Sequence, residues 1–205
     1  MIAFAGPVDG ILSWIHPDPP FMQRAGHAVA VDGRVWLIDP PDGEGVVERV
    51  RALGEPAGVL QLLDRHPRDC AALASQLDVP LHITPFGGVR AAPFEAFTVW
   101  RLPFWKEVGL WFASQRILVV PEALAGAPAI VAPGEEVGVH PMRRLLPPNA
   151  LRRYNPEHLL LGHGPALHGA AARAGIDDAL RGSRRRVPSL LVAQIRRAAS
   201  GTFRG

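Results

Sequence analysis

The order of apolar runs in the first 84 residues constrains the fold more than any other feature. Two β-rich runs flank Asp32-Gly33, which is a strong signal for a β-hairpin. Apolar residues then alternate between helical spacing and short continuous runs. The expected elements are a hairpin, helix, strand, helix and strand over residues 26–40, 44–53, 58–63, 70–77 and 80–84. This β-β-α-β-α-β order is typical of an α/β fold.

The second half of the chain predicts further strands and then helices. The expected strands cover residues 97–102, 108–112, 117–120 and 158–161, with a short helix at 149–154. From Gly169 onward the pattern is helical, with expected breaks at Gly175, Gly182 and Pro188. No linker divides the chain, so we expect one domain over 1–182 and a basic C-terminal helix and tail over 183–205 that belongs to it. The stripe Leu190, Leu191 and Ile195 predicts that this helix docks on the fold or on a second copy.

Composition and charge exclude several classes of protein. Hydrophobic residues make up 48% and charged residues 20%, which favours a packed core over intrinsic disorder. No apolar run approaches the roughly 18 residues of a membrane span, and the single cysteine excludes an internal disulfide and fits the cytoplasm. Residues 176–205 carry seven arginines and two aspartates, so the rest of the chain carries −2 of the total charge of +3. Because the fold itself is not basic, we do not expect a nucleic-acid partner.

Polar residues follow three of the apolar strands directly. One group is His66-Pro-Arg-Asp-Cys70, the second is Pro121-Glu122, and the third is Gly162-His163-Gly164. Loops on a rigid scaffold carry function, so these strand ends are the candidate sites.

These three places, in this order, resemble the metallo-β-lactamase-fold superfamily over nearly the whole chain. The hairpin ending in Leu-Ile-Asp39-Pro40 is similar to the start of that family, and Gly162-His163-Gly164 matches its last motif. The resemblance implies a four-layer αββα sandwich: two facing mixed sheets with helices on both outer surfaces. The expected core residues are Val35, Leu37, Leu60, Leu62, Leu118, Val120, Leu159 and Leu161.

The resemblance also implies that one of the family's two metal sites is lost. The family builds its first site from the first two histidines of an HxHxDH loop and a histidine in a later turn. Those positions hold Arg65, Pro67 and Trp105 in this chain, and none of the three side chains can ligate a divalent ion. We therefore expect at most one metal ion per chain.

The second site keeps donor atoms at the family's positions. The resemblance implies the ligands Asp69, Cys70 and His163, with Glu122 where the family has a bridging aspartate. Each residue also has a simpler interpretation: Asp69 as the N-cap of the following helix, Cys70 as a small buried hydrophobe, and Glu122 as a solvated turn residue. His66 lies one position out of register and is interpreted as a loop histidine.

Two functions from different classes remain open. The first is a divergent scaffold without a complete dinuclear site and without standard hydrolase activity, which binds a small molecule or a partner; the lost ligands favour it. The second is a mononuclear metal-dependent hydrolase of an ester, thioester, amide or phosphoester, in which Asp69 orients the metal-bound water. The expected cofactor is none or one divalent ion, with zinc preferred. A membrane partner is not expected, and a homo-oligomer is left open.

Overall fold

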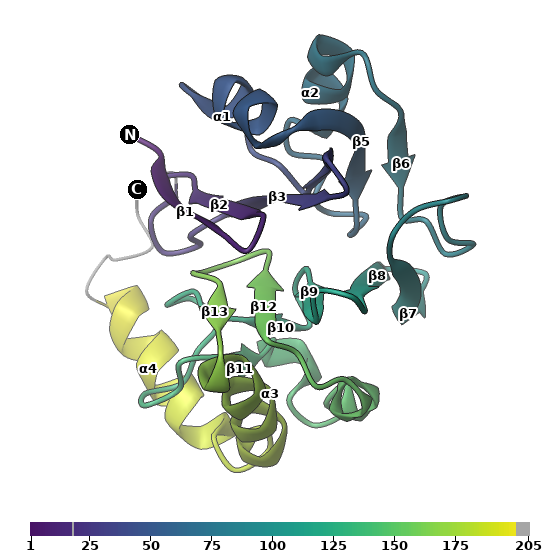
Figure 1. Ribbon diagram of the computed structural model, residues 1–205. Helices are drawn as coiled ribbons and strands as arrows, with labels where there is room; N and C mark the ends of the chain where they lie inside the picture. The colour runs from purple at the N-terminus through teal and green to yellow at the C-terminus, as the bar shows by residue number, and fades with distance from the viewer. Residues whose placement is uncertain (18, 200–205) are drawn as a thin grey trace.

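Two β-sheets form the centre of the molecule (Figure 1). The computed structural model describes residues 1–17 and 19–199, and the structural statements below refer to that part of the chain. The first sheet has the strand order β1 (Ala3–Val8), β2 (Ile11–Ile15), β3 (Ala25–Val31), β4 (Arg34–Ile38), β5 (Glu55–Gln61) and β6 (Leu81–Ile83). The second has the order β13 (Leu167–His168), β12 (His158–Leu161), β9 (Ile117–Val120), β8 (Trp105–Phe112) and β7 (Glu95–Leu102). Each sheet contains parallel and antiparallel pairs, so the prediction of two mixed sheets is confirmed.

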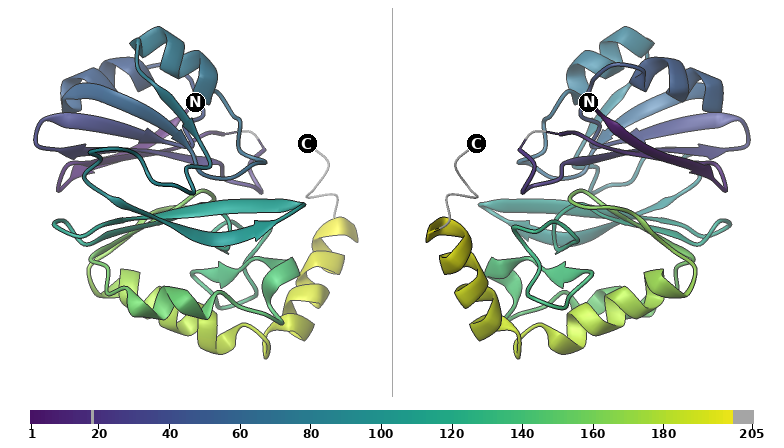
Figure 2. Two further views of the ribbon diagram at one scale, coloured as in Figure 1. Left: turned by 90° about the vertical axis from the view of Figure 1, so that its right-hand side faces the viewer. Right: turned by 90° about the vertical axis from the view of Figure 1, so that its left-hand side faces the viewer.

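The sheets and helices are stacked in four layers (Figure 2). Helices α1 (Val46–Leu53) and α2 (Cys70–Leu77) cover the outer face of the first sheet, and α3 (Ala170–Gly182) covers the outer face of the second. The inner faces share one apolar cluster that includes Ile38, Leu60, Leu110, Phe112 and Leu160. Removing this apolar surface from water is what holds the sheets face to face. The expected αββα sandwich is confirmed.

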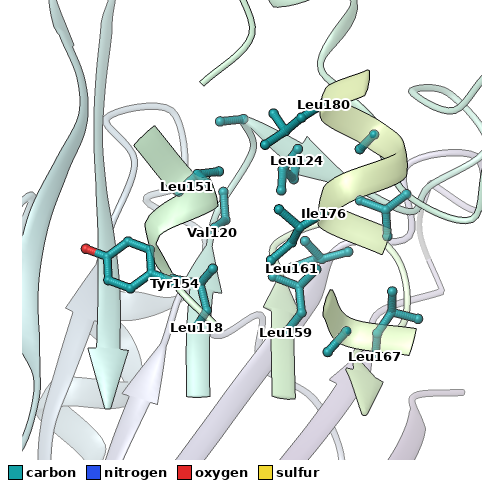
Figure 3. Packing of buried hydrophobic residues seen from close by; sticks show 14 of the residues in the cluster. Leu118, Val120, Leu124, Leu151, Tyr154, Leu159, Leu161, Leu167, Ile176 and Leu180 are labelled. Carbon is teal, nitrogen blue, oxygen red and sulfur yellow. The ribbon is translucent and has the colours of Figure 1, made fainter. Parts of the chain in front are cut away.

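The outer core of the second sheet lies under α3 (Figure 3). Ile176 and Leu180 of α3 pack in one cluster with Leu159 and Leu161 of β12. All eight core residues expected from the sequence are buried. The break expected at Gly175 is wrong, because this residue lies inside α3. A Cβ there would lie 2.9 Å from the Cδ1 of Leu167, so glycine permits the close approach of α3 to β13.

The connecting segments contain the remaining elements. Strands β10 (Leu124–Ala125) and β11 (Gly138–Val139) form a small separate pair. Two short 3₁₀ helices follow, η1 (Pro141–Arg143) and η2 (Asn149–Arg153), and the second matches the short helix expected there. Strands β1 and β2 were not anticipated from the sequence, because Gly6, Pro7 and an exposed outer strand obscure the apolar alternation.

Helix α4 (Val187–Ala199) packs on the loop before β11 through a narrow contact. Leu190 is buried, whereas Leu191 and Ile195 are 53% and 69% exposed, so within one chain only Leu190 of the expected stripe docks on the fold. Side-chain amide and guanidinium groups of Gln194 and Arg197 donate hydrogen bonds to backbone carbonyls of that loop. Residues 200–205 of the expected tail lie outside the described residues. Among the helices of residues 1–17 and 19–199, none combines the length and apolarity needed to cross a bilayer.

Candidate metal centre

Four strand ends meet at one edge of the two sheets. Asp39 directly follows β4, and His66 lies in the loop after β5; Glu122 and His163 follow β9 and β12. Strands β4 and β5 run parallel, as do β9 and β12, so the residues that follow each pair gather at the same edge. A backbone bridge between Arg24 and His163 joins the edge of the first sheet to that of the second. The fold therefore brings together residues that are up to 124 positions apart.

Two histidines and one carboxylate converge at this edge. Ring nitrogens of His66 and His163 and a carboxylate oxygen of Glu122 all lie within 4.8 Å of one another, and the three side chains are buried. The Nε2 atoms of the two histidines are 3.1 Å apart. No other group of three or more histidine, cysteine, aspartate or glutamate side chains within residues 1–17 and 19–199 is arranged to hold a metal ion.

The outer partners of the two rings fix the inner nitrogens as acceptors. Nδ1 of His66 lies 3.0 Å from Oδ2 of Asp39, and Nδ1 of His163 lies 2.9 Å from the carbonyl oxygen of Met22. Because a carboxylate and a carbonyl both accept, each Nδ1 carries the hydrogen of a neutral ring. Both Nε2 atoms then present lone pairs to each other. A cation or an additional proton between the two Nε2 atoms would satisfy both lone pairs.

Burial opposes the additional proton. It lowers the pKa values of His66 and His163 well below the ordinary value, and Arg68 adds to the effect on both rings. Burial also raises the pKa of Asp39 to about 6, which leaves it ionised above that pH and able to accept from His66. At neutral pH both histidines are therefore in the uncharged form that binds metals.

The donor set fits one divalent ion. Two imidazole nitrogens and one carboxylate oxygen form a ligand set of catalytic zinc sites, with the fourth position open to water or substrate. Zinc–nitrogen bonds of about 2.0–2.1 Å allow one ion to bind two nitrogens at the observed spacing. Asp39 behind His66 is the carboxylate that commonly orients a metal-bound histidine.

The three positions that the resemblance assigned to a first metal site hold no ligand side chain. The guanidinium of Arg65 lies over the ring of Trp105, 4.3 Å from its centre, and its Nη2 donates to Oε2 of Glu122 at 2.5 Å. Trp105 is buried. Pro67 lines the same cleft. The guanidinium of Arg65 thus contacts both Trp105 and one member of the three-residue group.

Two of the four expected ligands are not brought to this group. The carboxylate of Asp69 accepts a hydrogen bond from the backbone N–H of Asp42, so it does not act as the side-chain N-cap of α2 either. Cys70 packs in the apolar cluster under α2, and burial raises the pKa of its thiol to about 12. Its place in this cluster under α2 keeps the thiol away from the three-residue group. Glu122 and His163 are in the group, and the expectation of a solvated Glu122 is wrong because its side chain is buried.

Sequence reasoning missed three residues that build the centre. His66 was interpreted as a loop histidine, yet its ring is one of the two that converge. Asp39 was considered only as part of the hairpin; its place directly after an apolar strand was the available signal. Glu107 is a carboxylate within an apolar strand, and burial raises its pKa to about 7. Its Oε1 accepts the backbone N–H groups of Glu122 and Ala123, which fixes the loop that carries Glu122.

Arg68 fixes the loop that carries His66. Its backbone has a positive φ of 38°, a conformation that non-glycine residues rarely adopt. The guanidinium donates to the carbonyl oxygens of Ala25, Asp39 and Gly162, at 2.5, 2.5 and 2.7 Å. These carbonyls lie on or directly after β3, β4 and β12, so one side chain joins three strand ends across both sheets.

The centre opens into a cleft of about 440 Å³. It is lined by both histidines and Glu122 together with Met22, Arg24, Arg65, Pro67 and Arg68. The size is within the range of small-molecule sites.

Comparisons with known proteins address the fold. No protein-family model matches the sequence, and no curated protein matches it either. Among solved structures, DIM-1 metallo-β-lactamase aligns with a TM-score of 0.62 and 15% identity over 91% of this chain and 97% of its own. TMB-1 aligns with a TM-score of 0.62 and 13% identity over 91% and 97%. A metallo-β-lactamase from Pontibacter korlensis aligns with a TM-score of 0.60 and 11% identity over 88% and 99%. The chain therefore has the metallo-β-lactamase fold, as its hairpin and Gly162-His163-Gly164 motif indicated.

Proposed function

We propose that this protein is a hydrolase with a single divalent metal ion, preferably zinc, bound by His66, His163 and Glu122. The observation that carries the proposal is the 3.1 Å approach of two histidine Nε2 atoms whose Nδ1 atoms both donate to fixed acceptors. A metal ion held by these three residues would supply an activated water, with a pKa of about 7, and would polarise the scissile group of an ester, thioester, amide or phosphoester.

The chain's own residues hold and shape this centre. Asp39 accepts from Nδ1 of His66 through Oδ2, while its Oδ1 accepts the backbone N–H of Leu62 at 2.8 Å. The carbonyl of Met22 orients His163. Glu122 pairs with Arg65 through Oε2, and its Oε1 lies 3.8 Å from Nε2 of His140. Each ligand thus has a second contact that fixes its direction before anything binds.

A second candidate function is a non-catalytic protein that binds a small molecule in the same cleft. The ion pair between Arg65 and Glu122 favours this alternative, because it occupies one oxygen of the third ligand. The replacement of the first metal site by Arg65, Pro67 and Trp105 points the same way.

Elemental analysis separates the two candidates. We expect one equivalent of zinc, and not more, in protein purified without chelator, and a large loss of zinc in His163→Ala. His168→Ala is the matched control, because His168 lies at the other end of β12 and outside the centre. The zinc-loaded protein is then tested on chromogenic carboxylic and phosphoric esters, and hydrolysis should be lost in His163→Ala and kept in His168→Ala. Protein without metal would support the non-catalytic function, and two equivalents would contradict the single-ion site.

A further inference from the structure

Helix α4 carries an apolar face that points away from the fold. The helix lies at one edge of the molecule (Figure 2), and its residue Leu190 is buried against the domain. Leu191, Val192 and Ile195 are exposed. Because a helix turns by about 100° per residue, these three side chains lie on the side away from Leu190. They form the outer face of α4.

The loop over residues 142–146 adds exposed apolar side chains beside the start of α4. The hydroxyl of Ser183 donates to the carbonyl oxygen of Arg144 at 2.7 Å, and Nε of Arg184 donates to that of Leu145 at 3.0 Å. Within residues 1–17 and 19–199, six of the ten exposed large apolar side chains lie in this loop and on the outer face: Met142, Leu145, Leu146, Leu191, Val192 and Ile195. Such a concentration is typical of a surface that binds a partner.

A groove of about 530 Å³ continues the apolar surface between α4 and the loop before β11. Pro133 lines the groove from the loop, and Val192 and Ala193 line it from the helix. Arg196 and Arg197 also belong to its lining. Apolar and basic side chains of α4 therefore meet along one groove.

The segment that contains α4 is strongly basic. Residues 179–199 contain no aspartate or glutamate but six arginines: Arg181, Arg184, Arg185, Arg186, Arg196 and Arg197. The loop over residues 126–146, on which α4 packs, contains two glutamates and two arginines and so does not offset this charge. Of the neighbouring carboxylates, Asp178 and Glu135 pair with Arg186, and the other carboxylate of α3 pairs with arginines outside the segment. No ion pair within the described part of the chain involves Arg185 or Arg196, and both are exposed.

Three kinds of partner fit an exposed apolar face, and the charge beside it distinguishes them. A second copy docked symmetrically would place the same arginines opposite one another, and like charges repel. A nucleic acid would contact the guanidinium groups but would leave the outer face in water. An anionic membrane surface covers the apolar side chains and neutralises the arginines at the same time.

We propose that the outer face of α4 binds the surface of an anionic phospholipid membrane, with the helix lying in the plane of the interface. Leu191, Val192 and Ile195 enter the boundary of the acyl chains, while the long side chains of Arg185 and Arg196 reach the lipid phosphates. The sequence predicted no membrane partner because it contains no run long enough to span a bilayer. A helix that lies in the interface needs no such run. The inference is independent of the proposed metal centre.

Co-sedimentation of the full chain with lipid vesicles tests the inference. We expect vesicles of equal parts phosphatidylcholine and phosphatidylserine to bind the protein roughly tenfold or more tightly than phosphatidylcholine vesicles do, and added salt to weaken the binding. Leu191→Ser combined with Ile195→Ser should weaken binding to the anionic vesicles by roughly tenfold or more, because both side chains lose their apolar burial. Arg185→Gln combined with Arg196→Gln should weaken it about twenty-fivefold, or roughly fivefold for each arginine.

Two exposed residues of the first sheet supply the matched controls. Ile83→Ser removes an exposed apolar side chain from β6, and Arg34→Gln removes an exposed arginine from the start of β4. Both variants should bind the anionic vesicles as the wild type does. All the substituted side chains are exposed, and thermal melting checks that each variant is folded.

The other two partners give different results. If the anionic vesicles do not bind the protein, or bind both double variants as tightly as the wild type, the inference is wrong. A dimer in sedimentation equilibrium that dissociates in the Leu191→Ser, Ile195→Ser variant, without vesicle binding, would make this face an interface between copies. Binding of a DNA duplex that depends on Arg185 and Arg196 but not on Leu191 and Ile195, again without vesicle binding, would make it a nucleic-acid surface. None of these measurements depends on zinc, so they leave the proposed function to its own test.

Discussion

The two ends of β12 each carry a close pair of histidines, and the pairs differ in chemistry. At the end after β12, Nε2 of His66 and Nε2 of His163 are 3.1 Å apart. At its start, Nδ1 of His158 and Nδ1 of His168 are 2.8 Å apart, and Nε2 of His158 lies 3.3 Å from a carboxylate oxygen of Asp9. The spacing alone does not distinguish the pairs.

The outer partners distinguish them. At the start of β12, only His158 has a carboxylate behind it. If its Nε2 donates to Asp9, its Nδ1 accepts from Nδ1–H of His168, and the chain of hydrogen bonds is complete without an ion. In the other pair both rings have acceptors behind them, so both inner nitrogens are acceptors. Proximity of two histidines therefore does not make a metal site; the hydrogen-bond partners behind them decide.

The largest expected effect is the loss of zinc stabilisation when the first pair is broken. Zinc at a hundredfold excess over its dissociation constant should stabilise the protein by about 2.7 kcal/mol, a rise in Tm of about 5–10 °C at this size. His163→Ala should abolish this rise, and His168→Ala should keep it. Differential scanning calorimetry with and without zinc measures both. An equal loss in the two variants would remove the distinction between the pairs.

Asp39→Asn should make the first pair resemble the second. The amide of asparagine can donate to Nδ1 of His66, which would move the ring hydrogen to Nε2 and allow it to bond to His163. We expect zinc affinity to fall about tenfold to hundredfold, as is typical when the carboxylate behind a metal-bound histidine is lost. Competition with a chromogenic chelator measures the affinity. Asp9→Asn is the corresponding change behind the other histidine pair, and it should leave the zinc affinity unchanged.

A third histidine between the pairs should make stability depend on pH. His27 lies 2.8 Å from both Ser13 Oγ and the carbonyl of Leu161 in β12, and burial lowers its pKa to about 4. Between pH 6.5 and about 4 the unfolded chain binds a proton that the folded chain does not, so acidification destabilises the protein. Between pH 7 and pH 5 the free energy of unfolding should therefore fall by roughly 2 kcal/mol because of His27.

The fall in Tm across this interval should therefore be smaller in His27→Gln than in the wild type. Burial raises the pKa values of Asp39 and Glu107, which oppose the effect, but they act in both proteins and cancel in the difference. In His168→Gln the fall in Tm between pH 7 and pH 5 should stay closer to that of the wild type. If Tm depended on pH identically in His27→Gln and the wild type, the effect could not be assigned to His27.

The smallest effect should come from the C-terminal helix, which contributes no residue to either histidine pair. Removing residues 187–205 exposes the contact made by Leu190. Loss of about 1.5 kcal/mol of apolar burial would lower Tm by about 3–6 °C. The zinc-induced rise in Tm should persist in the shortened protein. Loss of that rise would mean that zinc stabilisation depends on global stability rather than on the outer partners of His66 and His163.

The fold could be predicted largely from the sequence because its signals are local. Apolar alternation placed the strands around Asp32-Gly33, and α2 lies at the predicted residues 70–77. His163 was identified for a similar reason, since it follows a buried strand between two glycines. The first two strands were missed because their outer edge is exposed and the apolar pattern is weak.

The sequence by itself, through its resemblance to the metallo-β-lactamase-fold superfamily, determined the αββα architecture and the candidacy of His163 and Glu122. Only the tertiary structure decided that His66 replaces Asp69 and Cys70 beside them. The loop path that selects His66 depends on the bonds of Arg68 to three carbonyls from distant strands. The protonation of the two rings likewise depends on Asp39 and Met22, which are distant in sequence from His163. Apolar periodicity is a property of neighbouring residues, whereas a ligand set and its tautomers depend on contacts that exist only after the sheets have packed.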